Sequence, residues 1–206
     1  MKIRMGLSPQ DIENHRESKL LKATGVFPEK PLLSETEWNS IVEYYLDTAP
    51  SSPLAQDPRS PIEPNLKLFA AERPKFRLSP PSTTMVQVSP KSRRIFMGDE
   101  ESKSLGIVSL DGDLLDSIKL NNVPVSLSET ERGLFITLIG HFIPSEDPQG
   151  SLVFLERSNT GFKPPQVILK ELPRTTQAEF ADLNGDGKTD FVVCAFGYIV
   201  GRLSWF

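Results

Sequence analysis

A short segment near the C-terminus concentrates the side chains that could do chemistry. Residues 182–190 read DLNGDGKTD, which has the form D-x-N-x-D-G-x-x-D. Calcium is a hard cation that takes several oxygen ligands, and side chains at alternate positions of a tight loop can point inward together. We therefore predict a calcium site here. Its ligands would be the side chains of Asp182, Asn184, Asp186 and Asp190 and the backbone carbonyl of Lys188.

The local sequence around these ligands separates this loop from an EF-hand. An EF-hand closes its cage with a glutamate at the twelfth position, and Cys194 and Ala195 occupy that neighbourhood instead. The flanking residues also read as strands and not as helices. Gly187 stands where the loop must turn sharply, a position suited to positive φ. The alternative is a solvated turn without an ion, but aspartates crowded into so short a segment repel one another unless a cation is present.

Other catalytic and metal-binding patterns are missing from the sequence. Cys194 is the only cysteine, so an internal disulfide, a Cys-rich zinc site and a Cys-x-x-Cys-His haem attachment are excluded. We expect this thiol to be buried and inert in an apolar strand. His15 and His141 are the only histidines and lie far apart in the chain. Neither a Gly-x-Ser-x-Gly elbow nor a phosphate-binding glycine loop occurs, so we predict that the chain is not an enzyme.

The elements that must position the loop are short alternating strands, which begin near Thr83. Four are expected in a first set, four in a second and three in a third: 85–88, 94–97, 105–108 and 114–120; 124–127, 133–139, 151–155 and 166–169; 177–181, 191–196 and 203–206. A tight hairpin turn is expected at Asp111-Gly112. The sets recur about every 40–50 residues, which is the period of propeller blades. We predict a mainly β chain, a partial β-propeller of about two and a half four-stranded blades preceded by two short α-helices.

The N-terminal region predicts those two helices. The first is expected from about Ser8 to Leu21, with Gly25 ending the run. The second begins at Ser34, which forms a capping box with Glu37, and its apolar face must pack against either a missing segment or the rest of the chain. The predicted organisation is a helical segment at 1–50, a Pro-rich linker at 51–82 and incomplete propeller blades at 83–206.

Composition and charge restrict the partners. The formal net charge of the 206 residues is −4, and no basic stripe marks a nucleic-acid or anionic-membrane surface. No stretch approaches the roughly 20 apolar residues of a membrane span. The segment Met1 to Gly6 is too short and polar for a secretory signal.

The residues that flank the loop resemble a known repeat. The segment 181–193, followed by Cys194-Ala195-Phe196-Gly197 and 201–206, is similar to FG-GAP/VCBS-repeat proteins of exported bacterial type. The resemblance implies a calcium-binding propeller and an extracellular or periplasmic location. Segments 5–7, 23–28 and 38–45 resemble the C-terminal half of a fused cytochrome c-like domain. Met5 would then be the only candidate axial ligand, and without Cys-x-x-Cys-His we do not expect haem in this chain.

The function expected from this reasoning is a non-catalytic binding or scaffold module that holds Ca²⁺ and binds a protein or glycan partner. Two alternatives stay open. The chain could be the remnant of a haem-binding electron-transfer protein, or an enzyme with acid and base groups at the ring centre, although we can place no such groups. Because two and a half blades leave a blade face uncovered, we expect a fragment from which the remainder of the propeller is missing.

Overall fold

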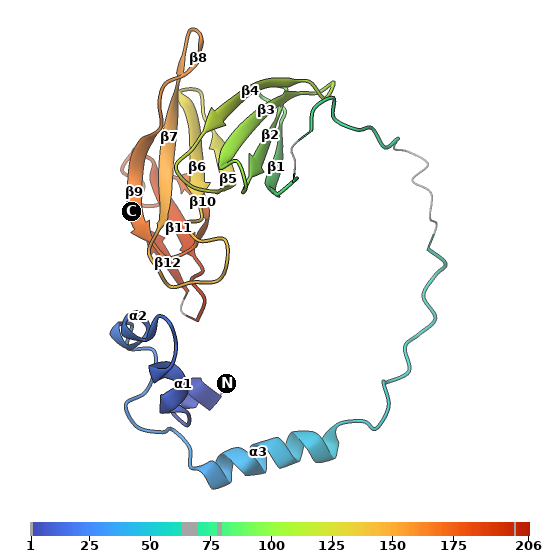
Figure 1. Ribbon diagram of the computed structural model, residues 1–206, viewed down its shortest axis with the longest axis vertical. Helices are drawn as coiled ribbons and strands as arrows, with labels where there is room; N and C mark the ends of the chain where they lie inside the picture. The colour runs from blue at the N-terminus through green and yellow to red at the C-terminus, as the bar shows by residue number, and fades with distance from the viewer. Residues whose placement is uncertain (1, 63–69, 78–79, 200) are drawn as a thin grey trace. The chain divides into compact units, whose positions relative to one another are not determined.

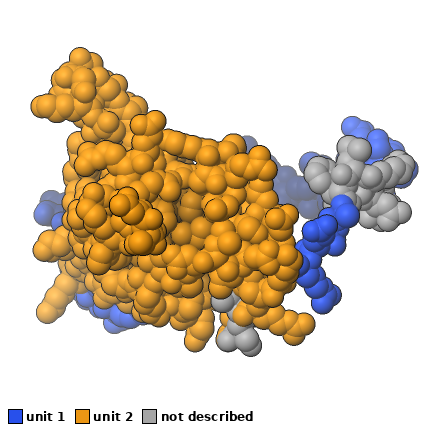
Figure 2. Space-filling model, turned by 90° about the horizontal axis from the view of Figure 1, so that it is seen from above, with its two compact units in different colours: residues 1–18, 22–73 blue, residues 19–21, 74–206 orange. Residues whose placement is uncertain are grey.

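The computed structural model describes residues 2–62, 70–77, 80–199 and 201–206, so residues 63–69 and 78–79 of the predicted linker lie outside the described residues (Figure 1). The chain divides into two compact units, one of residues 1–18 and 22–73 and the other of residues 19–21 and 74–206 (Figure 2). All the described strands belong to the second unit. None of the helices in the described part of the chain is long and apolar enough to cross a bilayer.

The N-terminal region holds three short α-helices and not two. The helical elements are η1 (Lys2–Met5), α1 (Pro9–Glu13), α2 (Ser18–Ala23) and α3 (Glu35–Thr48). The single helix predicted from Ser8 to Leu21 is wrong because the chain breaks between α1 and α2. There the Glu17 amide donates to Nδ1 of His15 at 3.1 Å. A side chain that captures a backbone amide in this way competes with the helix ladder.

The start of α3 is formed as the sequence predicts. The Glu37 amide donates to Oγ of Ser34 at 3.2 Å, and the Ser34 amide donates to Oε2 of Glu37 at 2.8 Å. This reciprocal pair satisfies two amides that the first helical turn leaves without partners. Within its own unit, α3 buries none of its side chains and Tyr45 is 69% exposed, so the packing predicted for its apolar face stays a prediction.

The second unit consists of three antiparallel sheets whose strands follow chain order. The chain is therefore mainly β, as predicted. The first sheet is β1 (Thr83–Ser89), β2 (Arg94–Asp99), β3 (Ser104–Ser109) and β4 (Leu114–Lys119). The second is β5 (Pro124–Glu129), β6 (Gly133–Leu138), β7 (Gly150–Ser158) and β9 (Gln166–Leu172), with the two-residue β8 (Gly161–Phe162) paired to the end of β7. The third is β10 (Thr175–Ala181), β11 (Asp190–Ala195) and β12 (Arg202–Trp205).

The sequence predicts all of these strands except β8, which is too short to show an alternating pattern. The predicted turn between β3 and β4 is also present. Gly112 has φ +82° and its amide donates to the Ser109 carbonyl at 3.1 Å. A positive φ at this position is what favours glycine in such turns.

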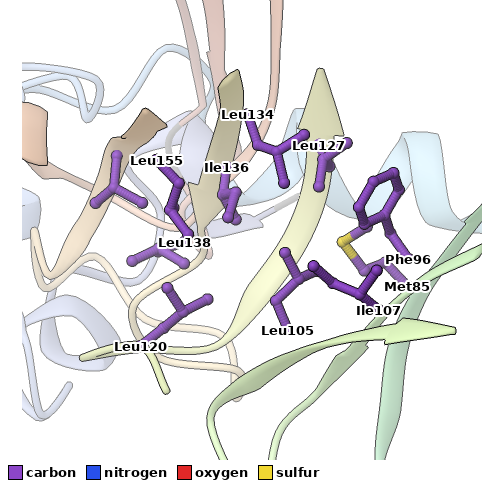
Figure 3. Packing of buried hydrophobic residues seen from close by; sticks show 11 residues of the cluster. Met85, Phe96, Leu105, Ile107, Leu120, Leu127, Leu134, Ile136, Leu138 and Leu155 are labelled. Atoms are coloured by element: carbon purple, nitrogen blue, oxygen red, sulfur yellow. The ribbon is translucent and has the colours of Figure 1, made fainter. Parts of the chain in front are cut away.

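Alternation along the strands of the second sheet lets it bury both faces. Leu134 and Ile136 of β6 are fully buried in a cluster with Phe96 and Leu105 of the first sheet, as Figure 3 shows. Phe135, which points to the opposite face, packs instead on the cluster that the second sheet forms with the third. The three sheets are thus stacked face to face, with the second in the middle.

The first strands of the first two sheets run parallel. The Thr84 hydroxyl donates to the Pro124 carbonyl at 2.5 Å near one end. At the other end the Ser89 hydroxyl donates to Glu129. Both bonds join residues 40 positions apart, so β1 and β5 lie side by side in register.

Candidate metal centre

The predicted ligand loop connects β10 to β11. The two strands pair until Ala181 lies opposite Asp190, and residues 182–189 form the connection between them. The segment is therefore a strand-to-strand loop, as the sequence predicts, and not a helix. On either side, Phe180 and Phe191 face each other in register with ring centroids 5.9 Å apart. The ends of the loop are fixed by packing while the loop itself is exposed.

Asp182 organises the first half of the loop through backbone amides. Its Oδ1 accepts hydrogen bonds from the amides of Gly185 at 2.7 Å and Asp186 at 3.2 Å. Its Oδ2 accepts from the amide of Gly187 at 2.9 Å. The loop backbone is therefore wrapped around this carboxylate.

The remaining predicted side-chain ligands are held by the same kind of contact. Oδ1 of Asn184 accepts from the Asp186 amide at 2.9 Å, and Oδ1 of Asp186 accepts from the Lys188 amide at 2.8 Å. Oδ2 of Asp190 accepts from the Leu183 amide at 2.9 Å and so ties the end of the loop to its beginning. Asn184 also donates to Oδ2 of Asp186 at 3.3 Å. The structure thus connects Asp182, Asn184 and Asp186 within one hydrogen-bonded turn.

Both loop glycines have the conformation that the sharp turn needs. Gly185 has φ +76° and Gly187 has φ +80°, and a Cβ on either would meet no atom within 4 Å. The requirement for glycine is therefore conformational and not steric. The positive φ predicted for Gly187 is confirmed.

The donor set suits a hard divalent cation. It comprises carboxylate, amide and carbonyl oxygens, and contains no sulfur or imidazole. Among the described residues, no group of three or more His, Cys, Asp or Glu side chains is already gathered around one point. The residues fit calcium by their chemistry and by the shared turn. A bound cation would offset the electrostatic repulsion among the three neighbouring aspartates.

The other residues singled out from the sequence have ordinary environments, with one correction. Cys194 is an exposed free thiol, because alternation in β11 buries Val193 and turns its neighbour outward. His141 pairs with Asp147, with 3.0 Å between Nε2 and Oδ2. The carbonyl of Met5 accepts from the Leu32 amide at 2.9 Å.

The sequence alone does not reveal the buried carboxylate of Glu146. This side chain lies in the loop between β6 and β7, where its Oε1 accepts from the amides of Tyr198 and Ile199, the first at 2.9 Å. Glu146 is only 6% exposed, and its two partners follow it by 52 and 53 residues in the chain. Glu146 therefore ties the loop between β6 and β7 to the segment that follows β11.

The first strands of the three sheets also line a groove of about 590 Å³. Its lining is mainly polar, with Gln87, Ser126 and Ser128 from β1 and β5 and Glu179 from β10. β1, β5 and β10 are each the terminal strand of their sheet. The groove contains no aromatic side chain among its described lining residues.

Comparison of the chain with protein-family models and with curated proteins found no match.

Proposed function

We propose that this chain is a calcium-binding, non-catalytic module of the β-propeller type, which presents loops and a polar groove to a protein or glycan partner. The observation that carries the proposal is the turn at residues 182–190, in which Asp182 alone accepts three backbone amides. Such a turn keeps several oxygen-bearing side chains within one short segment, and an ion would have to draw them around a common centre.

The arrangement of the sheets supports the propeller part of the proposal. Three antiparallel sheets stack face to face, and their strands follow chain order from one edge to the other. The terminal strands β1, β5 and β10 line a common groove. In a propeller the first strands of successive blades lie around a central channel, and the loops between strands gather on its two rims. We assign the chain about two and a half blades.

The rim is where we place the partner. The calcium loop joins two adjacent strands and is exposed over its whole length. An ion held there would fix the loop and lower the repulsion among its aspartates. A rigid loop binds a partner at a smaller entropy cost than a mobile one.

The decisive experiment measures unfolding of the full chain with and without calcium. An ion that binds only the folded state at about 100 times its dissociation constant stabilises that state by about 2.7 kcal/mol. We expect a rise in melting temperature in calcium that is absent in chelator. Asp186→Asn should abolish most of the rise, because the amide keeps the shape of the carboxylate and loses its charge.

The matched control is Asp111→Asn, which alters the Asp-Gly turn between β3 and β4, where too few oxygen ligands are present. This variant should keep the full response to calcium. The proposal fails if calcium leaves the melting curve of the native chain unchanged, or if Asp111→Asn and Asp186→Asn reduce the response equally. Titration of calcium by calorimetry gives the same comparison at constant temperature.

A further inference from the structure

The two outer sheets of the second unit each present one apolar face that no sheet covers. On the first sheet this outer face, here called the leading face, carries Val86 and Val88, which are 61% and 59% exposed. On the third sheet the trailing face carries Leu203 and Trp205, which are 69% and 60% exposed. Large exposed apolar patches on sheet faces are typical of interaction surfaces.

The middle strands show what each face is made to contact. β2 contains Ile95-Phe96-Met97 and β6 contains Leu134-Phe135-Ile136, so both carry a phenylalanine between two aliphatic residues. Each phenylalanine packs toward the following sheet, Phe96 toward the second and Phe135 toward the third.

Leu134 and Ile136 point the other way, toward the preceding sheet, and are fully buried by it. Ile95 and Met97 hold the same positions in β2 and flank Phe96, so they point away from the second sheet. They lie opposite Val88 and Val86 in the pairing of β1 with β2. The leading face is therefore built like the buried face of the second sheet.

The third sheet continues the same alternation. Val193 of β11 packs toward the second sheet, so its neighbours Val192 and Cys194 face outward. Trp205 and Leu203 of β12 lie opposite these two residues and complete the trailing face. Phe96 packs from the first sheet on the second, and Phe135 packs from the second sheet on the third. The trailing face is the corresponding face of the third sheet.

We propose that two copies of this chain associate head to tail, with the trailing face of each copy packed on the leading face of the other. The contact repeats the stacking that joins the first sheet to the second and the second to the third. Two copies with three sheets each give six sheets, within the range of about four to eight that closed propellers use. Closure about a two-fold axis covers both exposed faces on both copies.

A second copy is the occupant that the chain itself favours, since both halves of the contact are present on one molecule. The inference deepens the propeller part of the proposed function and is independent of the metal loop. The association should therefore be the same in calcium and in chelator, and in the Asp186→Asn variant. If calcium had no effect on unfolding, the calcium site would be refuted and the dimer would not. If the chain were a monomer, the dimer would be refuted and the calcium site would not.

Sedimentation of the full chain over a range of concentrations tests the proposal. We expect twice the mass of the 23.0 kDa chain. Val88→Glu damages the leading face and also alters the wall of the groove, which Val88 helps to line, while Trp205→Glu damages the trailing face. Each should weaken dimerisation by about 100-fold or more because a charge would be buried without a partner. Both side chains are exposed in the single chain, so the circular dichroism spectrum and the fold should be kept.

Mixing these two variants distinguishes a head-to-tail contact from a contact in which each face packs on the same face of the other copy. The Val88→Glu copy keeps an intact trailing face and the Trp205→Glu copy an intact leading face, so the mixture should form mixed dimers held by one good contact. Ile143→Glu is the control, since Ile143 is 73% exposed in a loop outside both faces, and it should leave the dimer unchanged. A monomeric native chain, an open series of larger assemblies, or a dimer that survives either face variant would overturn the proposal.

Discussion

Glu129 joins the first two sheets, and replacing it with glutamine should destabilise the fold. Its carboxylate is 5% exposed and accepts hydrogen bonds from the hydroxyls of Ser89 and Ser92 and from the guanidinium of Arg157. The serines belong to the first sheet and its first turn, while the arginine belongs to β7 of the second. Arg157 also lies over the ring of Phe162, with its guanidinium carbon 5.4 Å from the centroid.

The magnitude follows from the change in the three bonds. A hydrogen bond to a charged group contributes roughly 1.5–3 kcal/mol, and a neutral one roughly 0.5–1.5 kcal/mol. Only the two bonds from the serine hydroxyls become neutral, because the Arg157 donor keeps its charge, and converting these two costs about 2 kcal/mol. The side chain of Arg157 is 38% exposed and can regain water, which lowers its share. We expect Glu129→Gln to reduce the free energy of unfolding by about 2 kcal/mol.

Urea unfolding followed by circular dichroism measures this change, with Glu156→Gln as the matched control. Glu156 also pairs with a cation, with 2.9 Å between its Oε1 and Nζ of Lys163, but both side chains are more than a third exposed. Such a surface pair contributes less than about 1 kcal/mol. If Glu129→Gln lost no more stability than this control, the carboxylate could not be a tie between the sheets.

Three further predictions concern single sites. Burial raises the pKa of Asp99, but hydrogen bonds from the Ser102 hydroxyl and amide and from the Ser82 amide outweigh it, so its pKa lies below the ordinary 3.8. A lowered pKa stabilises the fold at pH values above the ordinary pKa, and this stability is lost as the pH falls through the pKa of the folded state. Urea unfolding of Asp99→Asn should therefore show less acid destabilisation than the native chain between pH 6 and pH 3. Gly133→Ala should lower the free energy of unfolding by about 3 kcal/mol or prevent folding, because its Cβ would lie 2.0 Å from the Leu155 carbonyl oxygen. The control, Gly106→Ala, makes only ordinary contacts and should change the midpoint of urea unfolding little. In the Trp205→Glu variant, whose trailing face should stay uncovered, alkylation of Cys194 by a thiol reagent should proceed without denaturant, and protection until unfolding would contradict its exposed position in the single chain.

The features that the sequence predicts well are those fixed by neighbours in the chain. The strands of the three sheets follow from alternation, the start of α3 from Ser34 and Glu37, and the turn at residue 112 from Asp-Gly. The loop at 182–190 is placed correctly between strands for the same reason. Positive φ at Gly187 also follows from spacing alone.

The features that the sequence does not reveal depend on residues far apart. Glu129 meets Ser89 across 40 positions, and Glu146 meets Tyr198 across 52. The groove of the first strands needs three sheets to be placed before it exists. Cys194 was assigned the wrong side because an apolar strand gives no sign of which face is covered until its neighbours are known. The break at His15 is a competition between side chain and backbone that helical periodicity does not register.

A row of aromatic rings packs beside the two ends of the exposed loop. Phe154, Phe135 and Phe180 pack in sequence with centroids 4.6 Å and 4.4 Å apart, and the row continues through Phe191 to Phe206. Phe180 and Phe191 are the residues next to the strand pair that closes the loop, so the second sheet fixes both of its ends. Any ordering caused by calcium is then confined to residues 182–189, and the entropy cost of binding falls on the loop alone. If calcium binds as proposed, it would change the rigidity of this loop while the sheets beneath it stay in place.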